Sequence, residues 1–546
     1  MCVGSNLAIT GSPAPSRLAS ASVPISLGPG SNFPTYLFDG ARDSNAGWQG
    51  PINSSNAALL GEVWSFATGG SVWAQPIIVN GVVYVGSSDG YEYAVYASNG
   101  TFLWKTFLGV DNATPICGGS PGVTSTATFF GGTIYVNGGY PDFYALNASN
   151  GHIRWQLPVG GSNAGGFYLW ASPLIYNHSA YVGIASQCDQ PLVPAGLERI
   201  SLTTHREIAY FNSSTPNPNG SSIWGSPSVN PQTNTIFVTT GNPYGTLTSK
   251  YGESIVALNA STLSVITSWQ IPRSQSFPDA DFGVTPVLFN LSNGLGAVAA
   301  ENKNGYLYTW YQSNLTLVWE SKIATEGGDH FSGAAADGRL FVVAHGVVIG
   351  GVSYNSSISA LNPDSGKILW QVGSAAVPNG GYSVPLITNK VLIVPIGLSL
   401  YCLNAVSGHV LARLQLGSVS TPPASVSRGE IFVGDGHHLI AYDVHLRLTA
   451  SQSDPSGPAP LTDSFNDTPT GGVPAYSYSW TFGDGTGSTL RDPTHTYQSP
   501  GTYIAKLTVT DLTGTMVTQQ LSVVVSSPTP RRLAAEQLPW ALEESP

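Results

Sequence analysis

A short motif recurs along this chain and limits its fold more than any other feature. The motif is an Ala-Leu-Asn run, a Gly four residues after the Asn, and a Trp four residues after that Gly. Complete copies span residues 145–155 and 360–370, and looser copies end at Trp104, Trp269 and Trp319. A decayed copy begins at Cys402. Such self-similarity, here with a spacing of about 50 residues, is typical of arrays of equal supersecondary units.

Short β-rich runs precede each copy of the motif. One run begins after a Ser-Pro or Thr-Pro pair, as at residues 172–175 and 285–288, and the next is rich in Val, Ile and Tyr, as at residues 133–136. Four short antiparallel strands in a repeat of about 40–50 residues form a propeller blade. We count eight units, centred near residues 85, 135, 182, 237, 298, 342, 393 and 432. The sequence therefore predicts an all-β chain with an eight-bladed β-propeller.

The last repeat ends near residue 443 without its Trp strand, and a spare strand containing Trp64 stands at residues 59–66. We expect this strand to close the last blade, because a closed ring leaves no free sheet edge. Composition agrees with an all-β fold: only 9% of the residues are charged, against roughly 25% in ordinary domains, which disfavours helical bundles and coiled coils.

Each residue type of the motif has a structural explanation. Glycine tolerates the positive φ of a tight turn, the Asn side chain caps that turn, and the Trp is expected to fill the wedge between neighbouring blades. The motif therefore identifies the fold and says nothing about catalysis.

Charge and hydropathy exclude two classes of partner. The formal net charge is −11 and no basic stripe is present, so we expect no nucleic-acid partner. The longest apolar stretch, residues 391–403, is interrupted by Pro395 and is shorter than the ~20 residues of a spanning helix, so we expect no transmembrane segment. Residues 1–32 are interpreted as a flexible N-terminal segment.

Glycosylation sequons indicate an extracellular or cell-surface protein. Asn-x-Ser/Thr occurs twelve times, about twice the number expected by chance. Turn chemistry is an alternative explanation, because β-turns also favour Asn and Ser. Cys117 and Cys188 lie in Gly/Pro-rich loops and could pair if the chain is exported, whereas Cys402 lies in an apolar strand. The sequons are Asn53, Asn99, Asn112, Asn147, Asn177, Asn212, Asn219, Asn259, Asn290, Asn314, Asn355 and Asn466.

With these repeats, residues 33–446 resemble the quinoprotein family, whose eight-bladed propellers carry the same Trp motif. Some members of that family are alcohol dehydrogenases that hold pyrroloquinoline quinone (PQQ) and Ca²⁺ in a central funnel, and others are non-catalytic scaffolds. The resemblance implies PQQ and Ca²⁺ as cofactors if this chain is catalytic.

Two segments match the family's site motifs. Residues 240–243 (Thr-Gly-Asn-Pro) resemble the segment whose Asn binds calcium, which makes Asn242 a candidate metal ligand. Residues 302–306 (Asn-Lys-Asn-Gly-Tyr) resemble the segment whose basic residue contacts the quinone, which makes Lys303 a candidate cofactor-binding residue. The alternative for both is a turn and a solvated loop.

The sequence also departs from the family. No carboxylate occurs at residues 246–252, where the family's catalytic Asp is expected, and Asp281 is the remaining candidate for the base. The adjacent-cysteine disulfide of many members is absent. The family's calcium-binding Glu is not found at residues 188–192, and neither Asp189 nor Glu253 matches the pattern well enough to be assigned.

From residue 447 the pattern changes to short alternating strands with frequent turns. The ordered set Trp480–Gly485, His495–Tyr497, Gly501–Tyr503 and Leu507–Asp511 closely resembles the PKD domain, an immunoglobulin-like β-sandwich. Strand alternation predicts Trp480 and Tyr503 to be core residues. We expect this domain at residues 447–527, followed by a tail at 528–546.

Two functions are compatible with these features. The leading hypothesis is an extracellular or cell-surface binding or scaffold protein, with the propeller as a platform for a protein or carbohydrate ligand and the PKD domain as a spacer or adhesion module. The alternative is a PQQ- and calcium-dependent dehydrogenase of an alcohol or polyol, which rests on Asn242, Asp281 and Lys303. Convergence of these three residues at the axis of the propeller would favour the dehydrogenase.

Overall fold

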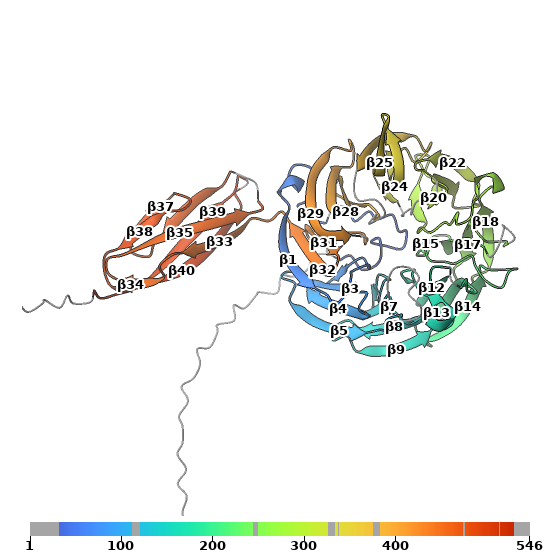
Figure 1. Cartoon of the computed structure of the whole chain (residues 1–546), viewed down its shortest axis with the longest axis horizontal. Helices are drawn as coiled ribbons and strands as arrows, with labels where there is room; N and C mark the ends of the chain where they lie inside the picture. The colour runs from blue at the N-terminus through green and yellow to red at the C-terminus, as the bar shows by residue number, and fades with distance from the viewer. Residues whose placement is uncertain are drawn as a thin grey trace, which may run out of the picture.

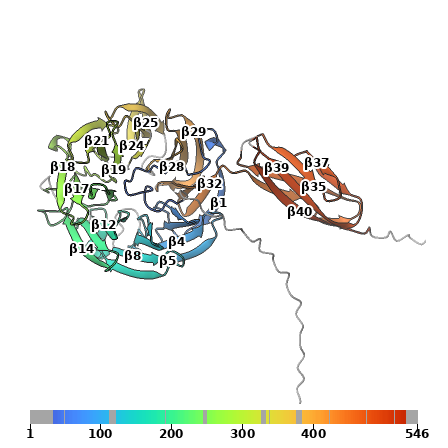
Figure 2. The same ribbon diagram turned by 180° about the vertical axis from the view of Figure 1, so that it is seen from behind.

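The structure is a computed structural model that describes residues 32–528, except positions 48, 112–120, 190, 244–248, 326–332, 337, 375–382, 421, 473–474 and 513. A ring of small sheets is followed by an elongated unit of C-terminal strands, which lies beside the ring in both views (Figure 1, Figure 2). The described residues form forty strands and three short 3-10 helices, η1 (Ala57–Leu59), η2 (Asn163–Gly165) and η3 (Arg273–Gln275).

Eight antiparallel sheets follow one another round the ring in the described part of residues 61–443, and together they confirm the predicted all-β propeller class. Most sheets have four strands, and the innermost strand of each is short. The first four sheets consist of β2 (Ile77–Val79), β3 (Val82–Gly86), β4 (Tyr91–Tyr96) and β5 (Phe102–Phe107); β6 (Thr128–Phe130), β7 (Thr133–Asn137), β8 (Asp142–Asn147) and β9 (Ile153–Pro158); β10 (Phe167–Tyr168), β11 (Leu174–Tyr176), β12 (Ser179–Ser186), β13 (Gly196–Ser201) and β14 (Arg206–Asn212); and β15 (Ser228–Asn230), β16 (Thr235–Thr239), β17 (Ser254–Asn259) and β18 (Val265–Gln270).

The remaining four sheets complete the ring. They consist of β19 (Val287–Asn290), β20 (Gly296–Asn302), β21 (Tyr306–Tyr311) and β22 (Leu317–Lys322); β23 (Ala334–Ala336), β24 (Arg339–Ile349), β25 (Val352–Leu361) and β26 (Ile368–Ser374); β27 (Leu386–Thr388), β28 (Val391–Asn404) and β29 (Val410–Ser420); and β30 (Ser425–Ser427), β31 (Glu430–Asp435) and β32 (His438–Asp443) with β1 (Gly61–Ala67). Strand β1 pairs antiparallel with β32, with Trp64 opposite Ala441. One sheet thus joins both ends of the ring, as the missing strand of the last repeat predicts.

The motif tryptophans join neighbouring sheets. Trp104 on β5 donates from Nε1 to the Ala148 carbonyl of the next sheet at 3.0 Å. Its indole covers Gly151, which has φ +73, and a Cβ at that glycine would lie 2.5 Å from the ring. Trp319 repeats this arrangement over Gly366, which has φ +67. The glycine therefore supplies both a left-handed turn and a docking surface for the preceding blade.

The segment that precedes the first sheet runs round the hub and hydrogen-bonds to the innermost strands. Arg42, which is fully buried, donates from this segment to the Pro227 carbonyl at 3.2 Å and to Thr35 Oγ1 at 3.0 Å. The backbone bonds are Ile78 N–Phe33 O (2.9 Å), Phe129 N–Pro34 O (2.8 Å), Val229 N–Gly40 O (2.8 Å), Leu288 N–Ala41 O (3.0 Å), Ala335 N–Asp43 O (2.8 Å) and Ile387 N–Ser44 O (3.0 Å). Residues 33–44 therefore link six of the eight sheets.

The C-terminal strands form two facing sheets, as the sandwich prediction requires. Trp480 and Tyr497 are almost fully buried between them, whereas Tyr503, predicted as a core residue, is only half-buried and donates to the Ser499 carbonyl at 2.9 Å. The sheets are β33 (Arg447–Gln452), β35 (Leu461–Thr470) and β38 (Thr494–Tyr497); and β34 (Ser456–Pro458), β40 (Met516–Ser526), β39 (Gly501–Thr510), β36 (Ser477–Thr481) and β37 (Gly487–Ser488).

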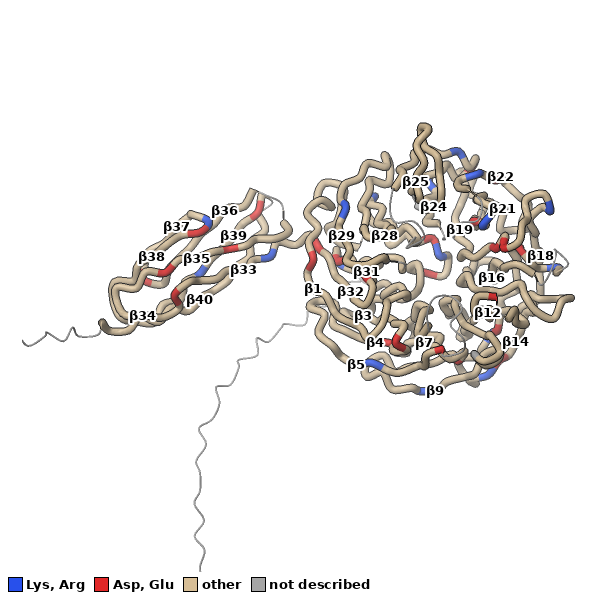
Figure 3. Tube along the Cα trace, in the orientation of Figure 1, with Lys and Arg blue, Asp and Glu red and all other residues tan. Residues whose placement is uncertain are grey.

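Charged residues are sparse along the whole trace, and the hub of the ring carries several of them (Figure 3). Across the described residues, no helix has the length and apolar character needed to cross a membrane.

Candidate functional site

Three consecutive sheets deliver polar residues to one face of the ring. Asp189 follows β12, Asn242 follows β16 and Lys303 follows β20, and each of these is the second strand outward in its blade, paired with the short innermost strand. Second strands of neighbouring blades end on the same face of a propeller, so these side chains converge although they lie far apart in sequence. Asp281 joins them from the segment between β18 and β19.

These residues line a cavity of about 450 Å³. Its walls include the indole rings of Trp170 and Trp224. A second cavity of about 340 Å³, lined by residues that precede the innermost strands of seven blades, shares both tryptophans. The two hollows therefore adjoin at the hub, in the size range of ordinary small-molecule sites.

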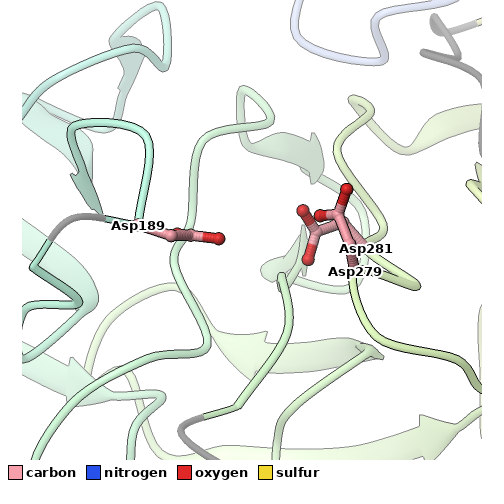
Figure 4. Close-up of side chains that lie close together, drawn as sticks. All are labelled: Asp189, Asp279 and Asp281. Atoms are coloured by element: carbon pink, nitrogen blue, oxygen red, sulfur yellow. The ribbon is translucent and has the colours of Figure 1, made fainter. Parts of the chain in front are cut away.

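Three carboxylates approach one another in this cavity. One oxygen each of Asp189, Asp279 and Asp281 lies within 4.8 Å of the others. Asp189 extends from one side of the cavity toward Asp279 and Asp281, which both project from one loop on the other side (Figure 4). Like charges at this separation repel, so the arrangement favours a bound cation.

Asn242 completes an oxygen-rich set. Its backbone N–H donates to Asp281 Oδ1. The side-chain amide atom that faces the carboxylates lies 3.0 Å from Asp189 Oδ2 and 2.7 Å from Asp281 Oδ1. Without a cation, the amide nitrogen takes this position and donates to both carboxylates. With a cation, the amide oxygen can turn inward, as a hard divalent ion requires.

Lys303 supplies the positive charge of the cluster. Its ammonium lies 2.8 Å from Asp279 Oδ1 and 3.0 Å from Asp281 Oδ2, and 5.4 Å from the centre of the Trp224 ring. Burial lowers the pKa of Lys303, but Asp281 and Asp279 raise it by more, so the pKa lies above its usual value and the ammonium stays charged.

Asp281 is the most deeply buried carboxylate of the group. Burial raises the pKa of Asp281 to about 7, Lys303 opposes this shift, and the charges of Asp279 and Asp189 add to it. One ammonium shared among three carboxylates does not cancel their desolvation and mutual repulsion. Asp281 therefore has the proton affinity of a group that can exchange a proton near neutral pH.

Backbone contacts and a glycine hold Asp281 in place. Phe282 N donates to the Thr240 carbonyl at 3.3 Å, and Lys303 N donates to the Asp281 carbonyl at 3.0 Å. Gly283 lies against the Trp224 indole, where a Cβ would come within 2.0 Å of ring atoms. The Asp-Phe-Gly sequence thus places the carboxylate beside the aromatic wall and leaves no room for a side chain at the third position.

The structure brings together all three residues singled out in the sequence, Asn242, Asp281 and Lys303. The cavity obtains its carboxylates from neighbouring blades and not from residues 246–252. Asp189 was considered in the sequence without being assigned, and Asp279 was not singled out. The signal that could have found them is their place in the repeat: Asp189 follows the second strand of its blade, and Asp279 precedes the first strand of the next blade but one. Glu253 instead accepts from Ser276 Oγ at 2.9 Å and lies outside the carboxylate cluster.

Family models match three parts of the chain. Residues 203–322 match the model described as the β-propeller domain of glucose, ethanol and alcohol dehydrogenases, and this range contains Asn242, Asp281 and Lys303. Residues 55–187 match the model of the outer membrane protein assembly factor BamB, and residues 446–525 match the PKD domain.

Curated relatives are distant. The polyvinylalcohol dehydrogenase of a Pseudomonas species is 22% identical over 390 residues, which cover 63% of this chain and 60% of the relative. The quinohemoprotein alcohol dehydrogenase of Comamonas testosteroni is 26% identical over 135 residues, 24% of this chain and 19% of the relative. The chain thus spans about 60% of the length of the first relative and much less of the second.

Solved structures of dehydrogenases share the fold. The Comamonas testosteroni enzyme has a TM-score of 0.64 at 16% identity, over 76% of this chain and 80% of that chain. A europium-containing methanol dehydrogenase has a TM-score of 0.62 at 16% identity, over 74% and 90%. Since the curated relatives above are dehydrogenases, the leading hypothesis of a binding or scaffold protein is wrong. The chain contains a PQQ-type β-propeller and a C-terminal PKD domain.

Proposed function

We propose that this protein is a dehydrogenase that oxidises an alcohol or polyol with bound PQQ and a divalent cation, Ca²⁺ in the first instance. The convergence of Asp189, Asn242, Asp281 and Lys303 in one cavity carries the proposal. The similarity to dehydrogenases of alcohols and polyvinylalcohol supports it.

The residues present fit both cofactors. Carboxylate and amide oxygens are the ligands that calcium prefers, and Asp189, Asp281 and Asn242 offer them from three directions. The flat indole of Trp224 suits a planar ring system, and the Lys303 ammonium above it suits the carboxylates of a quinone acid. When bound, the quinone supplies the two-electron acceptor and the cation supplies electrostatic activation.

Asp281 is the base in this scheme. Its carboxylate, which Lys303 holds beside the cation, would accept the hydroxyl proton of the alcohol. Lys303 holds that carboxylate through Oδ2 and keeps a positive charge beside the electron acceptor. Trp170 and Trp224 exclude water from one side of the cavity.

A titration tests the proposal. PQQ and Ca²⁺ are added to the purified chain, and absorbance and alcohol-dependent dye reduction are followed. We expect binding and turnover in the wild type, with turnover lost in Asp281→Asn and Lys303→Ala. Glu253→Gln is the matched control, because Glu253 is a buried carboxyl outside the cluster whose pKa burial raises to about 7. Absence of binding, or full turnover in Asp281→Asn, would contradict the proposal.

We also propose that the chain works outside the cell or at its surface as a glycoprotein, where its PKD domain contacts protein or carbohydrate. In support, none of the eleven sequon asparagines within the described residues is buried, and Asn112 lies outside them. These asparagines also cap turns: Asn147 Oδ1, for example, accepts a hydrogen bond from Ser149 N at 2.9 Å. Fractionation of the native source, with mass measurement before and after glycosidase treatment, tests both points; an intracellular chain of unmodified mass refutes them.

A further inference from the structure

The loop that carries Asp189 contains a tight left-handed turn. Cys188 and Asp189 have φ angles of 54 and 59, as in the turn at Asn177 and His178 and the turn at Asn389 and Lys390. Those two turns join paired strands, whereas Cys188 and Asp189 stand outside any strand. The ends of the loop are anchored, by Gln187 N to the Gly166 carbonyl at 2.7 Å and by Val193 N to Ser186 Oγ at 3.1 Å.

A covalent bond supports the centre of this loop. Cys188 forms a disulfide. The sequence predicts Cys117 as its partner, and Cys117 lies outside the described part of the chain. Cys188 lines the same 450 Å³ cavity as its neighbour Asp189. Of the four cysteines, Cys402 is free and buried, so three remain and the chain can hold only one internal disulfide.

Asp189 needs such support more than its partners do. Asp281 is fixed by backbone bonds on both sides, through Phe282 and Lys303. One oxygen of the Asp189 carboxylate stands within 4.8 Å of an oxygen of Asp279 and of Asp281, and the Asn242 amide bonds Asp189 Oδ2 at 3.0 Å. Repulsion would move a released loop away from the cluster.

We propose that the Cys188 disulfide positions Asp189 in the cation site, so that the oxidation state of this bond sets cation affinity. This inference rests on the proposed function, which supplies the cation site. Cys188 is a positioning residue: it acts through Asp189 and supplies no ligand itself. Reduction converts the disulfide into two thiols by taking two electrons and two protons from a dithiol reductant, which is itself oxidised to a disulfide.

Calorimetric titration of Ca²⁺ into the full chain tests the proposal without requiring turnover. Oxidised protein is compared with protein reduced by dithiothreitol and desalted without oxygen. We expect affinity to fall by about 10–100-fold on reduction, the range typical when the support of a metal ligand is lost. Cys188→Ser should match the reduced protein, and Cys402→Ala should keep the full difference, because Cys402 is buried away from the site.

Asp189→Asn separates positioning from general loosening. It should bind Ca²⁺ weakly in both states, and reduction should change its affinity no further. Equal affinities in oxidised and reduced wild type, with circular dichroism showing a folded chain, overturn the inference and leave the proposed function standing. An equal loss on reduction in Asp189→Asn also overturns it, because reduction then acts elsewhere. Absence of Ca²⁺ binding in oxidised wild type overturns both.

Discussion

Replacing Lys303 by Met removes the one cation that the described cluster contains. The side chain is 13% exposed and that of Asp281 is 6% exposed, so their 3.0 Å ion pair is a buried one. Asp279 is 58% exposed, and its bond to Lys303 adds little because solvent screens it. Breaking a buried pair by removing one partner costs about 3–5 kcal/mol, since the other charge is left uncompensated.

Ca²⁺ should offset this loss. A cation that binds only the folded state adds about 2.7 kcal/mol at a hundredfold excess over its Kd. In Lys303→Met the carboxylates no longer share an ammonium, so we expect tighter Ca²⁺ binding and a larger stabilisation than in the wild type. Without Ca²⁺ the unfolding free energy of the variant should be about 3–5 kcal/mol lower than that of the wild type.

Chemical unfolding of the propeller, followed by tryptophan fluorescence with and without Ca²⁺, measures both effects. Lys322→Met is the matched control: Lys322 is exposed, donates to the Asn304 carbonyl at 2.6 Å and lies over Tyr306. It should change stability by less than about 1 kcal/mol and leave the Ca²⁺ response unaltered. If Lys303→Met is as stable as the wild type without Ca²⁺, or if Ca²⁺ stabilises both equally, the reasoning is refuted.

Three further perturbations test the fold around the site. Arg42→Met should lower the unfolding free energy by about 3 kcal/mol in denaturant titrations, because it leaves the buried Pro227 carbonyl and the partly buried Tyr36 carbonyl without their donor. Gly366→Ala should cost more than Gly338→Ala in the same assay: both glycines have φ +67, but only at Gly366 would a Cβ meet Trp319, at 2.5 Å. Glu92 is fully buried without a hydrogen-bond partner among the described residues, and burial raises its pKa well above the usual value. Its neutral form favours folding, and that contribution is lost as pH rises, so Glu92→Gln should be more stable than the wild type at pH 8 and show no such advantage near pH 4; equal stability at both pH values contradicts this.

The repeats predict the propeller class because successive blades pack against one another through the same residue types. Trp104 and Trp319 both dock on a glycine turn of the next sheet, so a local pattern reports a non-local contact. Where the glycine is missing, the pattern fades although the contact remains. Trp155 stacks on His205, whose φ of 55 replaces the glycine conformation, with ring centres 4.6 Å apart.

The candidate site was harder to predict because no single stretch of sequence contains it. Asn242 and Lys303 stand in recognisable segments, but Asp189 follows a different strand, two blades before that of Lys303. The packing of three consecutive blades decides which loop ends meet, and no single motif contains that information. The sequence therefore offered Asp281 as a candidate and left Asp189 unassigned, although both reach the same cavity.

The rarity of charge in this chain strengthens the assignment of the cluster to function. Blades built from Gly, Ser, Thr and apolar residues need few ionic groups, and charged residues make up only 9% of the chain. Yet three aspartates meet in one cavity, where the single ammonium of Lys303 pairs with only two of them. Packing does not explain this, because glycine or serine would fill the same loops without repulsion. Three carboxylates thus share one ammonium in a single cavity, and a bound cation would balance the excess negative charge, as expected where local rules are broken for function.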